Sequence, residues 1–129
     1  MSHSDYNIIS SSIINAAVEV HKVFGPGLLE SVYEKALVWE MRQVGLFVQE
    51  QVPIDVTFKD LEIKNGYFAD IIVEDKIILE LKAIENILPV HKAQLLSYLK
   101  LADKKLGLLL NFHVKFLKQG ITRVINGEL

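Results

Sequence analysis

The sequence predicts an α/β sandwich in which helices cover a mixed β-sheet. Two stretches with helical hydrophobic spacing open the chain, and short apolar or alternating segments follow, with one more helical stretch among them. The 129 residues are 50% hydrophobic, which is enough for one buried core, and neither repeat nor linker divides them. We therefore expect a single domain over residues 1–129, with the element order α-α-β-β-β-α-β-β.

Two amphipathic helices are predicted first. The helix over residues 6–24 ends at Gly25-Pro26-Gly27, because glycine supplies a left-handed cap and proline cannot continue a helix. The second helix covers residues 28–44 and ends at Gly45. Apolar side chains form one stripe along the first helix: Ile9, Ile13, Ala16, Ala17, Val20 and Phe24.

The hydrophobic period then changes to that of strands. The first predicted strand contains a proline at position 53, which suggests an edge strand or a bulge, and a short polar turn joins the second strand to the third. A helix with proline in its first turn and two further strands complete the chain. The predicted segments are strands 47–59, 67–73 and 76–83, helix 89–102, and strands 105–112 and 120–125.

Composition narrows the classes of function. The chain has no cysteine, so disulfides and zinc–thiolate sites are excluded, and it contains no apolar run of the roughly 20 residues that span a membrane. The start of the chain lacks a secretory signal pattern, and we expect a cytoplasmic protein. A formal charge of −2 argues against a general nucleic-acid binder. The remainder becomes slightly positive if three carboxylates face a metal ion.

The third predicted strand carries two charges on one face. Glu80 and Lys82 are two residues apart and share a face, whereas Ile77, Leu79 and Leu81 point to the other, apolar side. Burying such charges is costly unless they are paired or bind a metal. Together with Asp70, they form either a metal-dependent phosphodiesterase site or a solvated sheet face.

The metal-site interpretation makes a demand on the strand register. A two-residue turn at positions 74 and 75 would pair residue 70 with residue 79 and place Asp70 on the wrong face. A three-residue loop or a bulge would pair Asp70 with Glu80. The sequence therefore predicts an odd-length loop or a bulge between these two carboxylates.

Two helix faces carry further candidates. Taken alone, the face of the third helix is better explained as a polar boundary face, and an acid near the N-terminus of the second helix is better explained by its stabilisation of the helix dipole. His21 is treated as a boundary histidine. The candidates are Glu30, Tyr33 and Glu34 on the second helix, and His91, Gln94 and Tyr98 on the third.

The segment from Gly27 to Tyr33 matches the pattern G-x-x-E-x-x-Y, and the chain resembles the GxxExxY protein family over nearly its whole length. That family is placed in the PD-(D/E)XK nuclease-like superfamily. Ala69 stands where the superfamily name has proline, at a position that varies widely. Other segments that carry the resemblance are His21, Asp70, Leu79–Lys82, His91, Gln94–Tyr98, Leu110–Phe112 and Gly120–Val124.

The resemblance implies a restriction-endonuclease-like three-layer core and a metal-dependent nuclease. Asp70, Glu80 and the backbone carbonyl of Leu81 would bind Mg²⁺ or Mn²⁺, with Glu30 as an extra acid from a helix. Lys82 would orient the attacking water and stabilise charge.

Further roles follow from the same resemblance. Gln94 and Tyr98 would match the Q-x-x-x-Y element of RecB-like members, with Gln94 in a catalytic role. Tyr98, Tyr33 and His91 would contact substrate.

Three functions remain open at this level. The first is a nuclease acting on DNA in repair, recombination or defence. The second is a catalytically silent module of the same fold that binds nucleic acid or a protein partner, and the third is a structural domain with a solvated charged face. Metal binding separates the third from the others, and cleavage separates the first from the second. A homodimer is expected by analogy alone.

Overall fold

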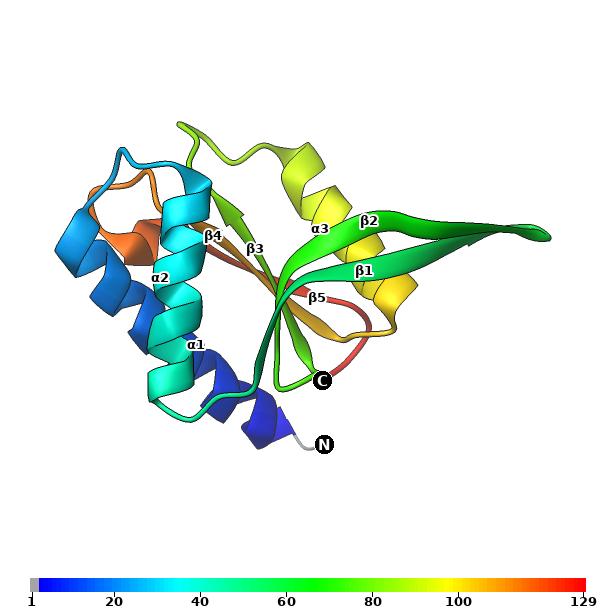
Figure 1. The fold of residues 1–129 in the computed structure, drawn as a ribbon, viewed down its shortest axis with the longest axis horizontal. Coiled ribbons are helices and arrows are strands. Elements are labelled where there is room, and N and C mark those ends of the chain that lie inside the picture. The colour runs from blue at the N-terminus through cyan, green and yellow to red at the C-terminus, as the bar shows by residue number, and fades with distance from the viewer. Residues whose placement is uncertain (1–2) are drawn as a thin grey trace.

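A five-stranded mixed sheet with helices on both faces forms the structure, a computed structural model that describes residues 3–129 (Figure 1). Its element order is the predicted α-α-β-β-β-α-β-β, so the α/β restriction-endonuclease-like class is confirmed. The elements are α1 (His3–Phe24), α2 (Glu30–Gln43), β1 (Val48–Phe58), β2 (Leu61–Val73), β3 (Ile77–Lys82), α3 (Pro89–Ala102), β4 (Leu106–Asn111), a short 3-10 helix η1 (Leu117–Gly120) and β5 (Ile121–Ile125).

The strands lie in the order β1-β2-β3-β4-β5. β3 and β4 are parallel, and the other neighbouring pairs are antiparallel. A parallel pair needs a long crossover connection, which α3 supplies. β1 is an edge strand, as the proline at position 53 indicated.

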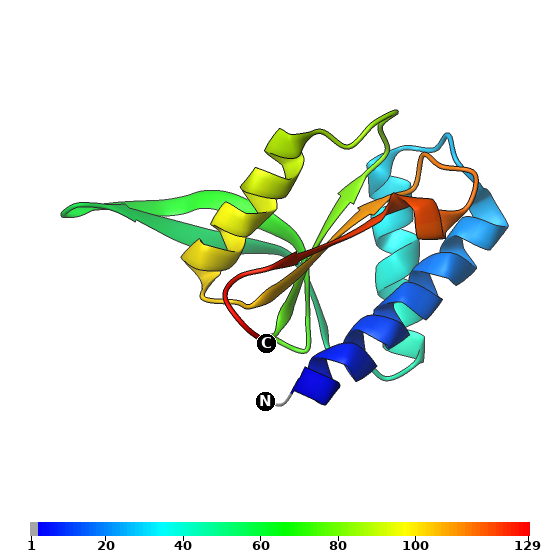
Figure 2. The ribbon, with the colours of Figure 1, turned by 180° about the vertical axis from the view of Figure 1, so that it is seen from behind.

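Helices cover the two faces of the sheet unequally. α1 and α2 lie on one face of the sheet and α3 lies on the other (Figure 2). Ile13 and Leu37 belong to the core cluster on the first face, and Leu95 and Leu99 belong to the cluster on the second. α3 approaches β4 closely, because a Cβ atom at Gly107 would lie 2.9 Å from the Leu95 side chain. β3 is therefore buried on both faces, and any polar side chain on it lies in an interior.

The loop between β2 and β3 has the predicted odd length. Val73 pairs with Ile77, which leaves three residues in the loop, and both Glu74 and Asp75 adopt positive φ angles of 54°. Ile71 pairs with Leu79, so the next position along β2, Asp70, lies level with Glu80. The register that the metal-site interpretation required is confirmed.

β2 begins at Leu61, six positions before the predicted start of this strand. Polar and turn-forming residues between positions 62 and 66 obscure the strand pattern. Residues 61–63 pair with β1, whereas residues 64–66 lie in a bulge between the pairs Val56–Ile63 and Ile54–Tyr67. The ladder shifts register next to Asp55, whose carboxylate accepts a hydrogen bond from the backbone N–H of Asn65 at 2.9 Å. β1 and β2 thus form a long arm that projects from the body (Figure 1).

None of the helices in the described part of the chain is long and apolar enough to cross a membrane.

Candidate functional site

Asp70 and Glu80 meet where the β2–β3 ladder ends. The last residue pair of this ladder is Ile71 with Leu79. Beyond this pair, the carboxylates of Asp70 and Glu80 accept hydrogen bonds from the backbone of the neighbouring strand. The N–H of Leu81 donates to Oδ2 of Asp70 at 3.0 Å, and the N–H of Asp70 donates to Oε1 of Glu80 at 3.4 Å. Each carboxylate is therefore held by the neighbouring strand, which fixes the distance between them.

The interior position of Glu80 changes its ionisation. Its side chain is 8% exposed, and burial, together with the neighbouring Asp70 carboxylate, raises its pKa to about 8. The charge of Lys82 acts in the opposite direction and favours the ionised form. Lys82 is half-buried and occupies the same face of β3 two residues away. The three charged groups of β2 and β3 that the sequence singles out are thus electrostatically linked.

The donor set fits a hard divalent cation. Burial and the neighbouring Asp70 carboxylate disfavour the ionised form of Glu80, and a bound dication would offset the negative charge at this position. Within residues 5–129, however, no group of three or more His, Asp or Glu side chains is arranged to hold a metal ion. The protein side chains that the structure brings together supply two carboxylates, so water or substrate oxygens would complete the shell.

The second helix brings Glu34 towards this pair. Oε1 and Oε2 of Glu34 accept hydrogen bonds from the Gln51 amide at 3.2 and 3.1 Å. Gln51 lies level with Asp70 in the β1–β2 ladder, and burial and the charge of Asp70 raise the pKa of Glu34. Glu30 is exposed at the first residue of α2, and no hydrogen bond or ion pair of the described residues joins it to Asp70 or Glu80.

Tyr33 lies in the core between the α2 helix and the sheet. Its ring stacks on Phe112 with a centroid distance of 4.5 Å, and its side chain is fully buried. The hydroxyl donates to the Gly25 carbonyl at 2.6 Å and accepts from the Leu28 N–H at 3.1 Å. The Tyr33 hydroxyl therefore stabilises the turn before α2, and it does not contact the Asp70–Glu80 pair.

The third helix contributes Tyr98. Its ring stacks on Tyr67 of β2 with a centroid distance of 3.8 Å, and the Tyr67 hydroxyl donates to the Tyr98 carbonyl at 3.3 Å. Burial and the negative charge of Glu80 raise the pKa of both tyrosines. The Tyr98 phenol is thus a neutral hydrogen-bond donor within electrostatic range of the carboxyl pair.

The other two candidates of α3 are placed differently. His91 accepts a hydrogen bond at Nδ1 from the N–H of Leu88 at 2.9 Å and thereby caps the helix. Gln94 is exposed, and the hydrogen bonds of the described residues do not include its side chain. It lies one turn before Tyr98, on the same side of the helix.

Asn111 supports the strand end that carries Lys82. Asn111 pairs with Lys82 in the parallel β3–β4 ladder. Its buried side-chain amide accepts a hydrogen bond from the N–H of Ile84 at 3.2 Å and donates one to the Ile84 carbonyl at 2.8 Å. The residues immediately after Lys82 are therefore tied to β4.

Two neighbours of the site escaped the sequence analysis, namely Gln51 and Tyr67. Neither belongs to a recognisable motif, and both reach the site only through the pairing of β1 with β2 and the packing of α3. The alternating pattern of the β1 segment was the single available signal, and it indicates a strand without indicating its partner residues.

Comparison with known proteins agrees with this geometry. The family model described as the PD-(D/E)XK nuclease superfamily matches residues 7–124. No curated protein and no solved structure gives a significant match to the chain.

Proposed function

The chain belongs to the PD-(D/E)XK nuclease superfamily, and from this premise we propose that it is a metal-dependent nuclease that hydrolyses phosphodiester bonds of DNA. The observation that carries the proposal is the pairing of the buried Glu80 with the half-buried Asp70, with Lys82 on the same strand face as Glu80. We further assign the chain to the GxxExxY family, on the segment from Gly27 to Tyr33. A cytoplasmic location remains a prediction.

Asp70 and Glu80, with the backbone carbonyl of Leu81, would hold Mg²⁺ or Mn²⁺. When bound, such an ion supplies Lewis-acid polarisation of the scissile phosphate and makes a nearby water more acidic. Lys82 would orient that water and offset the charge that develops on the phosphate. Because the pKa of Glu80 is raised, Glu80 must lose its proton before it can bind the ion, since only the carboxylate is a good ligand.

A third acid from α2 would complete the metal-facing set. Glu30 follows from the family resemblance, whereas the Gln51 contact and the pKa shift favour Glu34. Glu30→Gln and Glu34→Gln distinguish them. We expect the variant of the true ligand to weaken manganese affinity by tenfold or more, on the order of 1.4 kcal/mol, while the other binds as the wild type does.

Substrate contacts are proposed for the α3 face. Tyr98 would donate to a phosphate oxygen, and the exposed Gln94 would position the attacking water or the phosphate. Contacts of Tyr33 and His91 with substrate remain predictions, since backbone hydrogen bonds already engage the Tyr33 hydroxyl and Nδ1 of His91.

The decisive experiment is calorimetric titration of Mn²⁺ into the wild type and into Asp70→Asn/Glu80→Gln. Both proteins are then incubated with a panel of labelled DNA and RNA. A matched control, Asp60→Asn/Glu128→Gln, removes the same formal charge from two exposed positions. We expect metal binding and DNA cleavage in the wild type and in the control, and neither in the site variant.

Other outcomes have defined meanings. Cleavage that persists in a clean preparation of the site variant, or of Glu80→Ala, would refute the assignment. Metal binding without cleavage of any substrate would favour the second candidate, a catalytically silent module that binds nucleic acid or protein. The lack of a three-ligand group among residues 5–129 and the formal charge of −2 are the observations in its favour.

A further inference from the structure

The loop after β4 (residues 112–116) is tied to the end of α1. The Nε2–H of the buried His21 donates to the Val114 carbonyl at 2.8 Å. A Cβ atom at Gly120 would clash with the carbonyl oxygen of Asn111, so glycine at this position permits the close turn of the chain through η1. The backbone of the loop is therefore held in one place, and its exposed side chains stand at the end of α1.

A hollow of about 450 Å³ lies between this loop and α1. Lys22 lines it from the helix, and Lys115 and Lys118 line it from the other side. Among the described residues, no carboxylate contributes to the lining of this basic hollow, although the chain as a whole has a formal charge of −2. Three ammonium groups without an acid between them favour an anionic ligand with several charges.

Neighbouring acids do not neutralise the basic hollow. Lys115 and Lys118 are exposed, and no ion pair of the described side chains involves either of them. Lys22 lies 3.8 Å from the Glu19 carboxylate, and this pair is exposed as well. Exposed pairs contribute little to stability and are screened by salt, so a polyanion can displace Glu19. The hollow thus keeps the positive charge that phosphate groups would meet.

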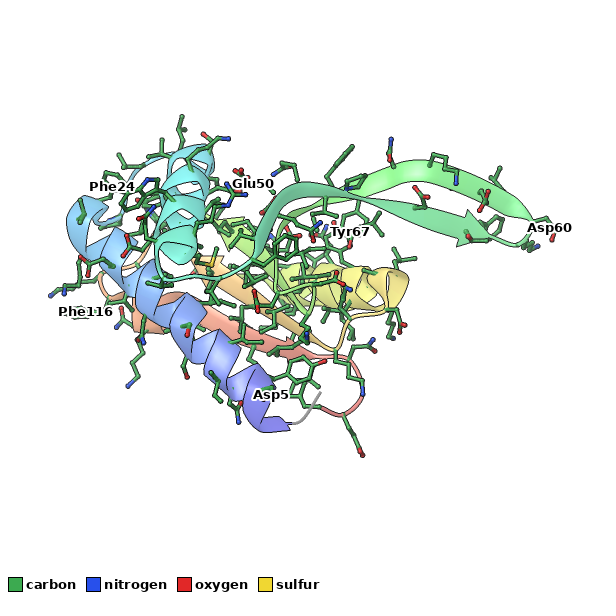
Figure 3. The ribbon with its side chains drawn as sticks, turned by 60° about the horizontal axis from the view of Figure 1, so that its bottom comes forward. Asp5, Phe24, Glu50, Asp60, Tyr67 and Phe116 are labelled. Carbon is green, nitrogen blue, oxygen red and sulfur yellow. The ribbon has the colours of Figure 1, made fainter. Side chains whose placement is uncertain are left out.

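An aromatic ring stands beside these charges. Phe116 also lines the hollow and is 61% exposed, and Nζ of Lys115 lies 5.5 Å from the centroid of its ring. In Figure 3, Phe116 lies at the end of the molecule opposite the arm tip at Asp60. Proteins that bind single strands stack bases on aromatic rings and hold the phosphates with basic side chains. A duplex keeps its bases stacked on one another, so the exposed ring favours an unpaired strand.

The basic hollow and the carboxyl pair belong to the same end of the sheet. Asn111, the last residue of β4, pairs with Lys82, and the Phe112 N–H donates to the Lys82 carbonyl at 2.9 Å. The loop that carries Lys115 and Phe116 therefore begins beside the strand end of Lys82. A nucleic-acid strand bound across this end of the sheet would reach both places.

We propose that the basic hollow binds a single-stranded part of the nucleic-acid substrate. Lys22, Lys115 and Lys118 contact its phosphates, and Phe116 stacks on one of its bases. The proposal rests on the proposed function, because it takes the bound polymer to be nucleic acid, and it adds that the substrate has an unpaired segment within reach of the bond that is cut. Phosphate contacts outside the reacting centre supply affinity that does not depend on the metal.

Binding is measured without metal, so that affinity is separated from cleavage. A labelled single-stranded DNA of about 20 nucleotides, longer than a typical single-strand site, is titrated by fluorescence anisotropy with a chelator present. The test variant is Lys115→Gln/Lys118→Gln. The matched control is Lys100→Gln/Lys105→Gln, which removes two exposed lysines at the opposite end of the sheet, where α3 leads into β4.

We expect the test variant to bind at least tenfold more weakly at low salt, and the control to bind as the wild type does. The slope of log Kd against log salt should fall by about 1.4 in the test variant, because each phosphate contact to a single strand contributes about 0.7. Equal affinities of the test variant and the wild type, or equal losses in the test variant and the control, overturn the proposal. So does a wild type without binding up to about 100 μM, since even non-specific affinities reach this range.

Phe116→Leu tests the preference for an unpaired strand, because leucine keeps an apolar side chain but cannot stack on a base. We expect the Kd for the single strand to rise about fivefold or more, and the Kd for a duplex of the same sequence to stay unchanged. An unchanged Kd for the single strand, or equal changes for both, overturns the stacking contact. Circular dichroism verifies that each variant keeps the fold.

Two comparisons separate this proposal from its alternatives. Polyglutamate that competes as well as DNA would overturn nucleic acid as the ligand and indicate an acidic protein partner instead. A wild type that binds the single strand through the basic hollow but cleaves nothing when metal is added would support the hollow and contradict the nuclease. Cleavage and affinity that are both unchanged in Lys115→Gln/Lys118→Gln would support the nuclease and overturn the hollow.

Discussion

Glu80 is a carboxyl group that the fold buries against a second carboxyl. Its ordinary pKa of 4.5 rises to about 8, first because of burial and then because of Asp70. A structural domain has no use for such a pair, since an apolar residue would fill the same space at lower cost. The pair becomes favourable when a cation neutralises it, which links the stability of this site to its proposed function.

The shift of Glu80 predicts a pH dependence of stability. Between about pH 4.5 and pH 8, the folded metal-free protein holds a proton that the unfolded chain releases. The free energy of unfolding therefore falls as the pH rises through this window, by up to about 1.4 kcal/mol per pH unit. Urea denaturation with a chelator present, at several pH values across the window, measures it. Glu80→Gln should flatten the dependence, and an unchanged slope in that variant would show that another group causes it.

Tyr33→Phe separates a structural from a substrate-binding role. The substitution removes one hydrogen bond to the Gly25 carbonyl and leaves the Leu28 N–H without its partner. We expect the free energy of unfolding to fall by about 1–3 kcal/mol. Manganese affinity and the KM for DNA should stay unchanged, because the hydroxyl is engaged in the turn. A raised KM at unchanged stability would support the substrate contact instead.

At the scale of elements, the site depends on the register of β2 and β3. The three-residue loop after Val73 places Asp70 level with Glu80, and a loop one residue shorter would turn Asp70 to the other face. α3 must also approach the sheet closely enough for Tyr98 to stack on Tyr67. Gly107 permits this approach, since any side chain there would contact Leu95.

Gly107→Ala is therefore predicted to push α3 away from β4. The added methyl group would lie 2.9 Å from the Leu95 side chain, closer than van der Waals contact. We expect a loss of about 1–3 kcal/mol in the free energy of unfolding. Leu95→Ala should lower the free energy of unfolding less in the Gly107→Ala background than in the wild type, because the smaller side chain relieves the clash with the added methyl group. Strict additivity in the double-mutant cycle would show that the two sites do not interact.

At the scale of the whole molecule, the carboxyl pair lies where the projecting arm, the central sheet and α3 meet. Asp70 belongs to the arm strand β2, Glu80 to the central strand β3, and Tyr98 to the covering helix. An ion bound between Asp70 and Glu80 would therefore connect the arm to the body. Metal binding should stabilise the fold as a unit.

This connection predicts a metal-dependent thermal shift. Mn²⁺ at about one hundred times its dissociation constant should add about 2.7 kcal/mol to the free energy of unfolding and raise the Tm of the wild type. Asp70→Asn/Glu80→Gln should show no shift, and Asp60→Asn/Glu128→Gln should behave as the wild type does. Calorimetric scans with and without Mn²⁺ measure the effect. Equal shifts in all three proteins would indicate binding away from the carboxyl pair.

The sequence by itself determined the fold class and the element order, and it singled out Asp70, Glu80 and Lys82 as the candidate site. These follow from local information, because hydrophobic period, turn residues and the alternation of faces along one strand are properties of adjacent positions. The sequence also predicted that the loop between β2 and β3 must have an odd length, or contain a bulge, if Asp70 is to share a face with Glu80. The missed part of β2 runs from Leu61 to Gly66. Pairing with β1 holds residues 61–63, and residues 64–66 form a bulge, so local propensity does not reveal this part of the strand.

Only the tertiary structure decided which other residues reach the carboxyl pair. Glu34 and Glu30 lie on the same helix and carry the same chemistry, and the Gln51 contact across β1 distinguishes them. Tyr33 looked like a site residue but lies in the core, whereas Tyr67 carried no signal and stacks beside the site. These placements depend on cross-strand pairing and on the depth at which helices pack. Both join residues far apart in the chain, so no local pattern encodes them.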